Sequence, residues 1–189
     1  MIWWLCFELV WQVSVAMPAL ERGDFAAALP PLERACRNKE NNGCYLLGRA
    51  LLSLDRFSQA KVVLTRQRPS DPFPWRVDDA LGLIAEATGD AAEPLFARAI
   101  AGNRNASLEP RLHYGQYLVR QGSPADALVP LASAAKQFPA HAQVRFEHGR
   151  ALYQLGRLAE AEAELVASNS EAAQALLAKV RRQRASGRP

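Results

Sequence analysis

The stretch that decides the fold is NNGCYLLGRALLSLDRFSQAKVVLTRQRPSDP, residues 41–72. Apolar residues recur at helical spacing within Leu46–Leu54, and a second helical pattern runs through Phe57–Leu64. The polar pair Asp55-Arg56 separates the two patterns, and Asp71-Pro72 closes the unit. The stretch therefore predicts one helical hairpin. Because a hairpin of this size cannot bury its own apolar face, copies of it should flank the stretch on either side.

Copies of the hairpin are marked by a glycine in the middle of each first helix. These glycines stand 34, 33 and 34 residues apart, at Gly48, Gly82, Gly115 and Gly149. Glycine inside a helix costs up to about 1 kcal/mol relative to alanine, so its recurrence indicates the close approach of a neighbouring helix. Sixteen residues after three of these glycines stands a large aliphatic side chain, at Leu64, Leu131 and Leu165. In the second unit the spacing shortens by two residues, and Phe96 takes that place.

A turn is predicted seven residues after each of these glycines. Gly89, Gly122 and Gly156 hold that place in three units, and Asp55 holds it in the first. Glycine supplies the left-handed conformation that ends a helix. Twelve residues after the helix glycine come the small residues Ala60, Ala127 and Ala161, which suit tight helix packing; with the shortened spacing, Ala92 takes that part in the second unit.

This period and residue set resemble the tetratricopeptide repeat family. In the first full unit the matching residues are Leu47-Gly48, Leu51, Leu54, Phe57, Ala60, Leu64 and Pro72, and in the last they are Gly149, Leu152, Leu155-Gly156, Leu158, Ala161 and Leu165. The resemblance implies an all-α, right-handed α-solenoid of helix-turn-helix hairpins. The chain departs from the family four residues before each glycine, where the usual tryptophan is replaced by Cys44, Asp78, Arg111 and Arg145.

The repeat alignment predicts the organisation of the whole chain. Residues 1–16 form a hydrophobic N-terminal segment, and 17–40 a partial repeat. Four repeats follow at about 41–74, 75–107, 108–141 and 142–169. Residues 170–189 form a capping helix with a basic tail, and such a cap keeps the exposed end of an array soluble.

The N-terminal segment 1–16 has two interpretations. It is almost wholly apolar, is shorter than a comfortable membrane span, and ends Ser14-Val15-Ala16, the small-x-small form of a signal-peptidase site. No basic residue precedes the apolar run, however, and Glu8 interrupts it. An export signal, cleaved or retained, and a buried first helix of the array both remain open.

The cysteines resemble those of the Sel1-like repeats of cysteine-rich exported bacterial proteins. Cys36 and Cys44 enclose seven residues, and the resemblance implies a disulfide between one hairpin and the next. The alternative is two small buried thiols. Cys6 would leave with a signal peptide, which makes the remaining count even. No second ligand pair of metal spacing accompanies the two cysteines, so a zinc site is disfavoured.

Composition and motifs argue against an enzyme and against a nucleic-acid binder. The net charge of +4 is mild, although it fits acidic partners. His113, His141 and His148 form no metal-binding pair on one helix face, and Glu160, Glu162 and Glu164 are expected to form a solvated strip. The sequence has no phosphate-binding glycine loop and no nucleophile elbow. We therefore expect no cofactor, no metal and no small-molecule substrate.

In the tetratricopeptide repeat family the first helices line a concave groove, and the resemblance extends this groove to the present chain. The inner positions lie six and three residues before each glycine and one, four and five after it. Ten side chains at these positions suit contact with a protein or peptide: Tyr45, Arg49, Leu52, Arg76, Glu86, Gln116, Arg120, Phe146, Arg150 and Tyr153. The same positions include Asp79, Leu112 and Val119.

The groove also excludes one class of partner. Family members that bind chaperone tails clamp a terminal carboxylate with asparagine directly after the glycine, where this chain has Arg49, Leu83, Gln116 and Arg150. The leading hypothesis is therefore a non-catalytic scaffold in a periplasmic or membrane-associated bacterial complex, with a cytoplasmic location as the alternative. A structural subunit anchored through residues 1–16, with no peptide groove in use, is the rival function. A remote third is an enzyme with a site built of scattered groove residues.

Overall fold

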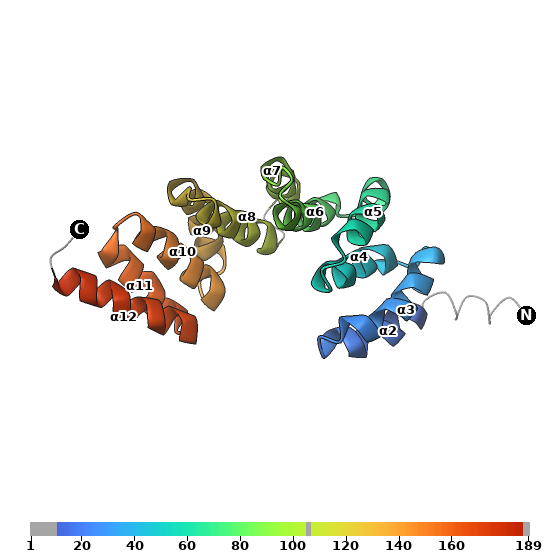
Figure 1. The fold of residues 1–189 in the computed structure, drawn as a ribbon, viewed down its shortest axis with the longest axis horizontal. Helices are drawn as coiled ribbons and strands as arrows, with labels where there is room; N and C mark the ends of the chain where they lie inside the picture. The colour runs from blue at the N-terminus through green and yellow to red at the C-terminus, as the bar shows by residue number, and fades with distance from the viewer. Residues whose placement is uncertain (1–10, 105–106, 187–189) are drawn as a thin grey trace, which may run out of the picture. The chain divides into compact units, whose positions relative to one another are not determined.

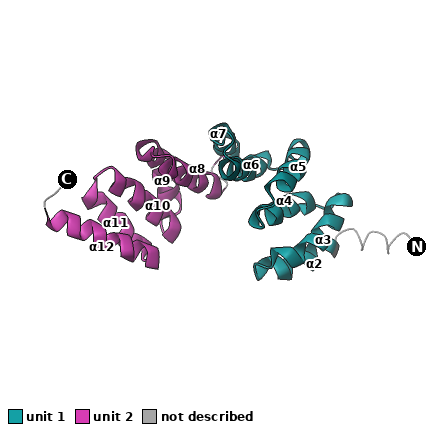
Figure 2. Cartoon of the chain, viewed as in Figure 1, with its two compact units in different colours: residues 1–103 teal, residues 104–189 magenta. Residues whose placement is uncertain are grey.

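The fold is that of a computed structural model, which describes residues 11–104 and 107–186. The chain forms two compact units, Met1–Asn103 and Arg104–Pro189, and each is described by itself (Figure 2). Every regular element of the described residues is helical, so the all-α prediction is confirmed. Cys6 and the first ten residues of the predicted N-terminal segment lie outside the described residues.

Unit 1 consists of three antiparallel hairpins in chain order (Figure 1). Its helices are α2 (Trp11–Glu21), α3 (Phe25–Arg37), α4 (Gly43–Ser53), α5 (Phe57–Gln67), the 3₁₀ helix η1 (Arg68–Ser70), α6 (Pro74–Thr88) and α7 (Glu93–Asn103). Each α-helix packs against the next along the chain, and α4 also packs against α2 and α6. The first helices of successive hairpins therefore lie side by side within the unit.

Unit 2 repeats the arrangement with two hairpins and a final helix. Its helices are α8 (Glu109–Arg120), α9 (Pro124–Gln137), α10 (Ala142–Gln154), α11 (Leu158–Ser168) and α12 (Glu171–Ala185). α10 packs against α8, α9, α11 and α12. The predicted capping helix corresponds to α12, whose first turn is capped by Ser170 Oγ accepting from the amide of Ala173 at 3.2 Å.

The first hairpin extends further toward the N-terminus than the predicted partial repeat. α2 runs without a break across Ala16–Met17, where a signal peptidase would cut if residues 1–16 were a cleaved export signal. Ala16 is fully buried and belongs to the same apolar core as Leu32 of α3. Residues 11–16 thus form part of the first hairpin. Within the described residues, no helix combines the length and apolarity that crossing a membrane requires.

The periodic glycines make room for the large side chain of the partner helix. A Cβ atom on Gly115 would lie 2.4 Å from Cγ of Leu131, and one on Gly48 would lie 2.5 Å from Cγ of Leu64. A Cβ on Gly82 would meet the ring of Phe96 at 2.8 Å. Leu64, Leu131 and Phe96 are all fully buried. The predicted close approach is therefore confirmed, together with the shortened spacing of the second repeat.

The predicted turns also have the expected conformation. Gly89, Gly122 and Gly156 have φ values of 77°, 76° and 73°. Asp55 takes the same left-handed conformation at φ 56°, which a residue with a short polar side chain tolerates better than most. Gly23, between α2 and α3, has the same conformation at φ 73°, so the turn geometry is common to the five described hairpins, and four of them use glycine.

Three of the four positions that lack the family's tryptophan form polar or covalent links between neighbouring elements. Cys44 lies against Cys36 of α3, and Asp78 is 2% exposed while it receives hydrogen bonds from Arg68 and Arg98. Arg145 donates from Nη1 to Oε2 of Glu164 at 2.7 Å. The fourth, Arg111, is buried. Specific pairs therefore occupy sites that one large aromatic ring would otherwise fill.

Cys36 and Cys44 form a disulfide bond. Cys36 is in the last turn of α3 and Cys44 in the first turn of α4, so the bridge spans the junction of the first two hairpins.

We expect the isolated protein to resist thiol alkylation at Cys36 and Cys44 until a reductant is added. Replacing both cysteines with serine should lower the free energy of unfolding by about 2–3 kcal/mol, because the unfolded chain loses a short closed loop. Mass spectrometry after alkylation and urea denaturation measure the two effects. Replacing Cys6 alone is the control for a general thiol effect. Full alkylation of both cysteines without reductant would contradict the bridge.

Candidate functional site

The ten predicted contact residues divide between the two units, and all lie on first helices. Tyr45, Arg49 and Leu52 belong to α4, and Arg76 and Glu86 belong to α6. Gln116 and Arg120 belong to α8, and Phe146, Arg150 and Tyr153 belong to α10. Nine of the ten are half-buried, and Arg120 is exposed. The first helices therefore present two candidate faces, α4 with α6 and α8 with α10.

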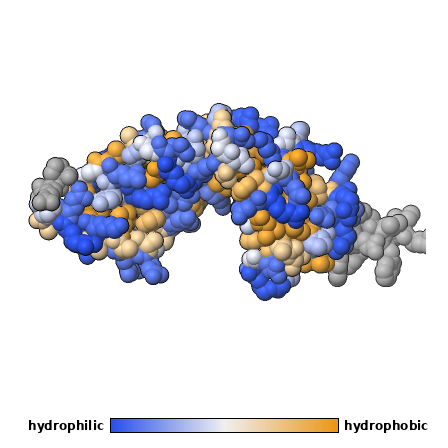
Figure 3. Space-filling model, viewed as in Figure 1, coloured by the Kyte–Doolittle hydropathy of each residue, from blue (hydrophilic) through white to orange (hydrophobic). Residues whose placement is uncertain are grey.

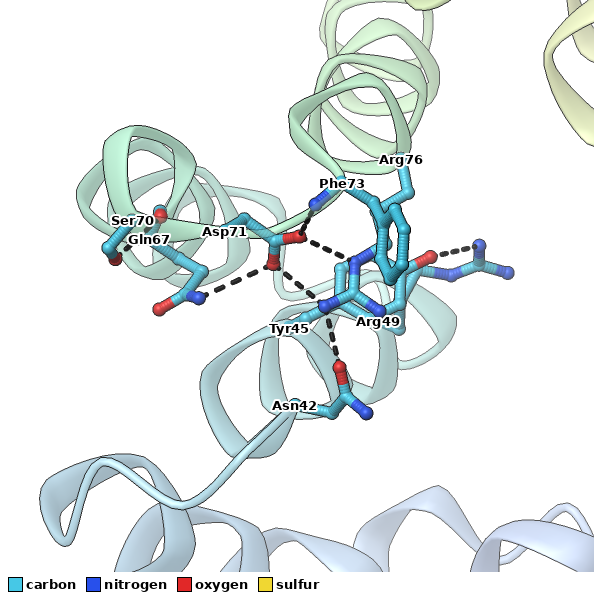
Figure 4. Close-up of polar contacts among 8 residues, drawn as sticks. All are labelled: Asn42, Tyr45, Arg49, Gln67, Ser70, Asp71, Phe73 and Arg76. Carbon is cyan, nitrogen blue, oxygen red and sulfur yellow. Dashed lines mark hydrogen bonds and ion pairs between the residues drawn. The ribbon is translucent and has the colours of Figure 1, made fainter. Parts of the chain in front are cut away.

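In unit 1 the central feature is a buried carboxylate that holds an arginine (Figure 4). The side chain of Asp71 is 0% exposed, and that of Arg76 is 13% exposed. Arg76 donates from Nε to Oδ1 of Asp71 at 2.8 Å and from Nη2 to Oδ2 at 2.9 Å. The amide of Phe73 donates to the same Oδ1 at 2.8 Å. Such charge-assisted, two-pronged bonding fixes the guanidinium in place.

The fixed guanidinium of Arg76 connects α6 to α4. Its Nη2 donates to Oδ1 of Asn42 at 2.6 Å, and its Cζ lies 4.1 Å from the centre of the Tyr45 ring. The hydroxyl of Tyr45 in turn accepts from Nη1 of Arg49 at 3.3 Å (Figure 4). Arg76 therefore acts as a support that positions Tyr45, and Arg49 stands at the end of the network.

In unit 2 the corresponding face is organised around Glu147. Its side chain is 6% exposed, and its Oε1 accepts from Nε2 of Gln116 at 3.0 Å. Arg150 approaches with Nη2 2.9 Å from Oε2 of Glu147, and its Cζ lies 6.0 Å from the ring centre of Phe146. The bond from Gln116 joins α8 to α10, so residues 31 positions apart in sequence share one surface.

Three positions of the predicted groove are buried, which corrects the expectation that they face a ligand. Asp79 is 2% exposed, Leu112 5% and Val119 4%. Leu112 and Val119 belong to the apolar core of unit 2. The spacing from the glycine predicts which Cα atoms lie on the inner side of a helix. Whether the side chain is exposed depends on the neighbouring side chains.

The expected solvated strip of glutamates is wrong for two of its three members. Glu162 pairs with Arg181 at 2.8 Å and also with Arg184 of α12. Glu164 pairs with Arg145 at 2.7 Å and lies 3.2 Å from Nδ1 of His148. These carboxylates therefore join α11 to its neighbours. Glu160 alone is mostly exposed, and it pairs with Arg157.

Acidification should weaken unit 2 through Glu164. Burial raises the pKa of this carboxyl, but hydrogen bonds from His148 and Arg145 outweigh burial, so its pKa lies below the usual value. A folded-state pKa below the unfolded one contributes stability above the unfolded pKa of about 4.3, and that contribution disappears as pH falls through the folded pKa. Urea denaturation at several pH values should therefore show a shallower acid slope for Glu164→Gln, with a loss of about 1 kcal/mol at neutral pH.

Glu160→Gln is the matched control, since its exposed pair with Arg157 is screened by salt. We expect its effect on the acid slope to vanish at high salt, while that of Glu164→Gln persists. Identical acid slopes for Glu164→Gln and the unmodified chain would contradict the role of this ion pair.

Sequence reasoning missed Asp71 and Glu147, the two buried carboxylates that organise the faces. Asp71 belongs to the motif that closes a hairpin, and Glu147 lies two residues before Gly149, outside the inner positions. One signal was available, since Asn42 and Arg76 stand 34 residues apart, one repeat period, and the structure joins them. No group of three or more potential metal ligands occurs among the described residues.

Comparison with known proteins agrees with this architecture. Residues 118–184 match the sequence profile of the tetratricopeptide repeat family. No curated protein sequence matches the chain.

Solved structures are similar to this chain over most of its length. The tetratricopeptide repeat protein TTC0263 of Thermus thermophilus aligns with a TM-score of 0.69 at 16% identity, over 89% of this chain and 96% of that one. YrrB, described as having an unusual peptide-binding site, aligns at 0.62 and 18% identity, over 87% of this chain and 89% of that one. A MamA mutant aligns at 0.60 and 20% identity, over 86% and 96% of the two chains. These identities support the fold alone.

Proposed function

Since residues 118–184 match the tetratricopeptide repeat family and both units are built of the same kind of hairpin, we propose that this chain is a non-catalytic scaffold. It binds a protein or peptide through the first-helix faces. The fold supports this because repeat hairpins present extended surfaces and carry no chemistry of their own. The peptide-binding site of YrrB supports the same kind of ligand.

The observation that carries the proposal is the surface of α8 and α10. Arg150, Phe146 and Tyr153 lie half-buried on α10, and Gln116 joins them from α8 through Glu147. Nε of Arg150 donates no hydrogen bond to any described residue. Arginine and tyrosine beside an apolar ring are the residue types that dominate binding energy at protein interfaces.

The face of α4 and α6 is the second part of the proposed surface. Leu52 and Tyr45 pack on the apolar core while they stay partly exposed, and Arg49 is half-buried beside them. Figure 3 shows apolar residues gathered around α3 and α4 in the view drawn. The guanidinium of Arg76 packs against the Tyr45 ring and is paired with Asp71, so it is not free to bind a partner. The arginines favour partners with acidic groups.

An exported or membrane-associated bacterial complex is the setting we propose. Its support is the Cys36–Cys44 bridge, because disulfides persist in oxidising compartments and are rare in the cytosol.

Photo-crosslinking tests the binding face directly. With p-benzoylphenylalanine in place of Tyr153, we expect capture of a discrete partner, which mass spectrometry identifies. The same group at Val129, an exposed position on the second helix α9, should capture little of it. Adding Arg150→Glu to the Tyr153 probe should reduce capture about tenfold, because the change replaces the anchor with a like charge for an acidic partner.

Arg182→Glu provides the matched charge control, since Arg182 is exposed on α12 and its side chain bonds only to the carbonyl of Ala178 in the described structure. Capture should be unaffected by it. Equal capture from Tyr153 and Val129, or equal loss from both charge reversals, would place the interaction elsewhere.

A further inference from the structure

An open pocket lies in unit 1, and Asn42 is its one lining residue at an inner position of the repeats. It has a volume of about 990 Å³ and forms where the end of α3, the loop that follows it, the last turns of α5 and η1 meet. The Cys36–Cys44 bridge lies in its wall and ties the end of α3 to the start of α4. The pocket is therefore held open by a covalent link, which lowers the ordering cost of binding.

The pocket rim is positively charged. Arg37, Lys39 and Arg66 line it, all three are exposed, and none has an ionic or hydrogen-bonded side-chain partner in the part of the chain that the structure describes. Glu40 is the one carboxylate of the lining, and its Oε2 accepts from the amide of Val13 at 3.1 Å.

The helix ends beside the pocket do not cancel this charge. α3 and α5 both end there, and each C-terminus carries about half a negative charge. The three positive charges of the rim exceed the combined negative charge of these two helix ends and Glu40. The pocket therefore attracts anions.

An apolar surface accompanies the cations. Val62 of α5 lines the pocket and is 68% exposed. Val63, Pro72 and the disulfide add further apolar atoms to the lining. A volume of this size accommodates a few side chains of a bound segment. An anionic ligand for this pocket should therefore also carry an apolar group.

We propose that this pocket binds an acidic peptide segment of a partner protein, with one apolar side chain over Val62 and the disulfide and with carboxylates at Arg37, Lys39 and Arg66. Nucleic acid fits less well, because no aromatic side chain lines the pocket for base stacking. A membrane surface fits less well because the apolar atoms lie within a concavity. The pocket shares only Asn42 with the face of α4 and α6, and its test is independent of the crosslinking at α10.

Fluorescence anisotropy with a defined probe tests the assignment. The full chain is titrated against a fluorescein-labelled peptide GDEFLEDG and against its amide counterpart GNQFLQNG. We expect saturable binding of the acidic peptide below about 1 mM, at least about tenfold tighter than binding of the amide peptide. Arg37→Glu combined with Arg66→Glu should weaken the acidic peptide at least about tenfold.

The matched control is Arg22→Glu combined with Arg56→Glu. Both arginines are exposed in unit 1, neither lines the pocket, and the change in net charge is the same. This control variant should change the affinity for the acidic peptide by less than about twofold. For the apolar contact, Val62→Asp should weaken binding, while Val129→Asp, an exposed valine of unit 2, should not. Urea midpoints of all variants establish that they fold.

Equal weakening by the two double variants, equal affinity for the two peptides, or no saturable binding would overturn the proposal. It would also be overturned if the pocket variant left the peptide affinity intact while it abolished binding of duplex DNA or phosphatidylserine vesicles. The Tyr153 crosslinking result does not affect these outcomes, so the two proposals can fail separately.

Discussion

Replacing Arg76 with alanine should lower the free energy of unfolding by about 3–5 kcal/mol. The change leaves the carboxylate of Asp71, which is 0% exposed, without its cation, and a buried charge that loses its partner is strongly destabilising. It also removes the bond to Asn42 and the contact with the Tyr45 ring, which connect α6 to α4. Urea denaturation followed by far-UV circular dichroism measures the loss.

Two further variants define the cause. Arg49→Ala removes a single bond to the Tyr45 hydroxyl and should cost about 1 kcal/mol. Arg76→Lys keeps the charge but not the planar fork, so it should recover only part of the loss. If Arg76→Ala were no more harmful than Arg49→Ala, Asp71 would not depend on this ion pair.

Gly115→Ala should destabilise the protein by about 1–3 kcal/mol, even though alanine favours helices by up to about 1 kcal/mol. The new methyl group would lie 2.4 Å from Cγ of Leu131, so the leucine or the helices must move. Gly149→Ala should cost less, because there the nearest atom, Cγ of Leu165, is 2.9 Å away. The measurement is again urea denaturation of the full chain.

A double variant tests whether contact between these two positions causes the loss. Gly115→Ala combined with Leu131→Val should be less destabilised than the sum of the two single changes, since the smaller valine leaves room for the methyl group. Strict additivity, or a gain in stability from Gly115→Ala, would contradict the close packing.

The fold was largely predictable because its determinants recur at a fixed distance. Gly48 and Leu64 belong to one repeat, and the same pair returns as Gly115 and Leu131. A steric requirement that repeats with the period can be detected from one sequence. The irregular second repeat has the same contact, because Phe96 packs against Gly82 at the spacing shortened by two residues.

The candidate faces were less predictable, because each depends on a carboxylate that occurs once. Asp71 and Glu147 stand at different positions of the repeat. Their partners are distant in sequence or in another element: Arg76 of α6 binds Asp71, and Gln116 of α8 binds Glu147. The sequence places Arg76 among groove residues, but only three-dimensional contacts show that its guanidinium is already engaged. Burial of Leu112 and Val119 was missed for a related reason, since neighbouring helices cover them.

The polar links that replace the family's tryptophan have a consequence for how the hairpins assemble. An aromatic ring in every repeat would make successive hairpins nearly equivalent, so that one could dock in another's place. Two of these links join successive hairpins: Cys44 bonds to Cys36 of the preceding hairpin, and Asp78 pairs with Arg68 at the end of the preceding hairpin. A hairpin docked one repeat out of register would lose the disulfide or separate Asp78 from Arg68, and the second loss leaves a buried carboxylate with one of its two cations. We therefore expect these links to select the native order of stacking over the misassembled forms to which repeat proteins are prone.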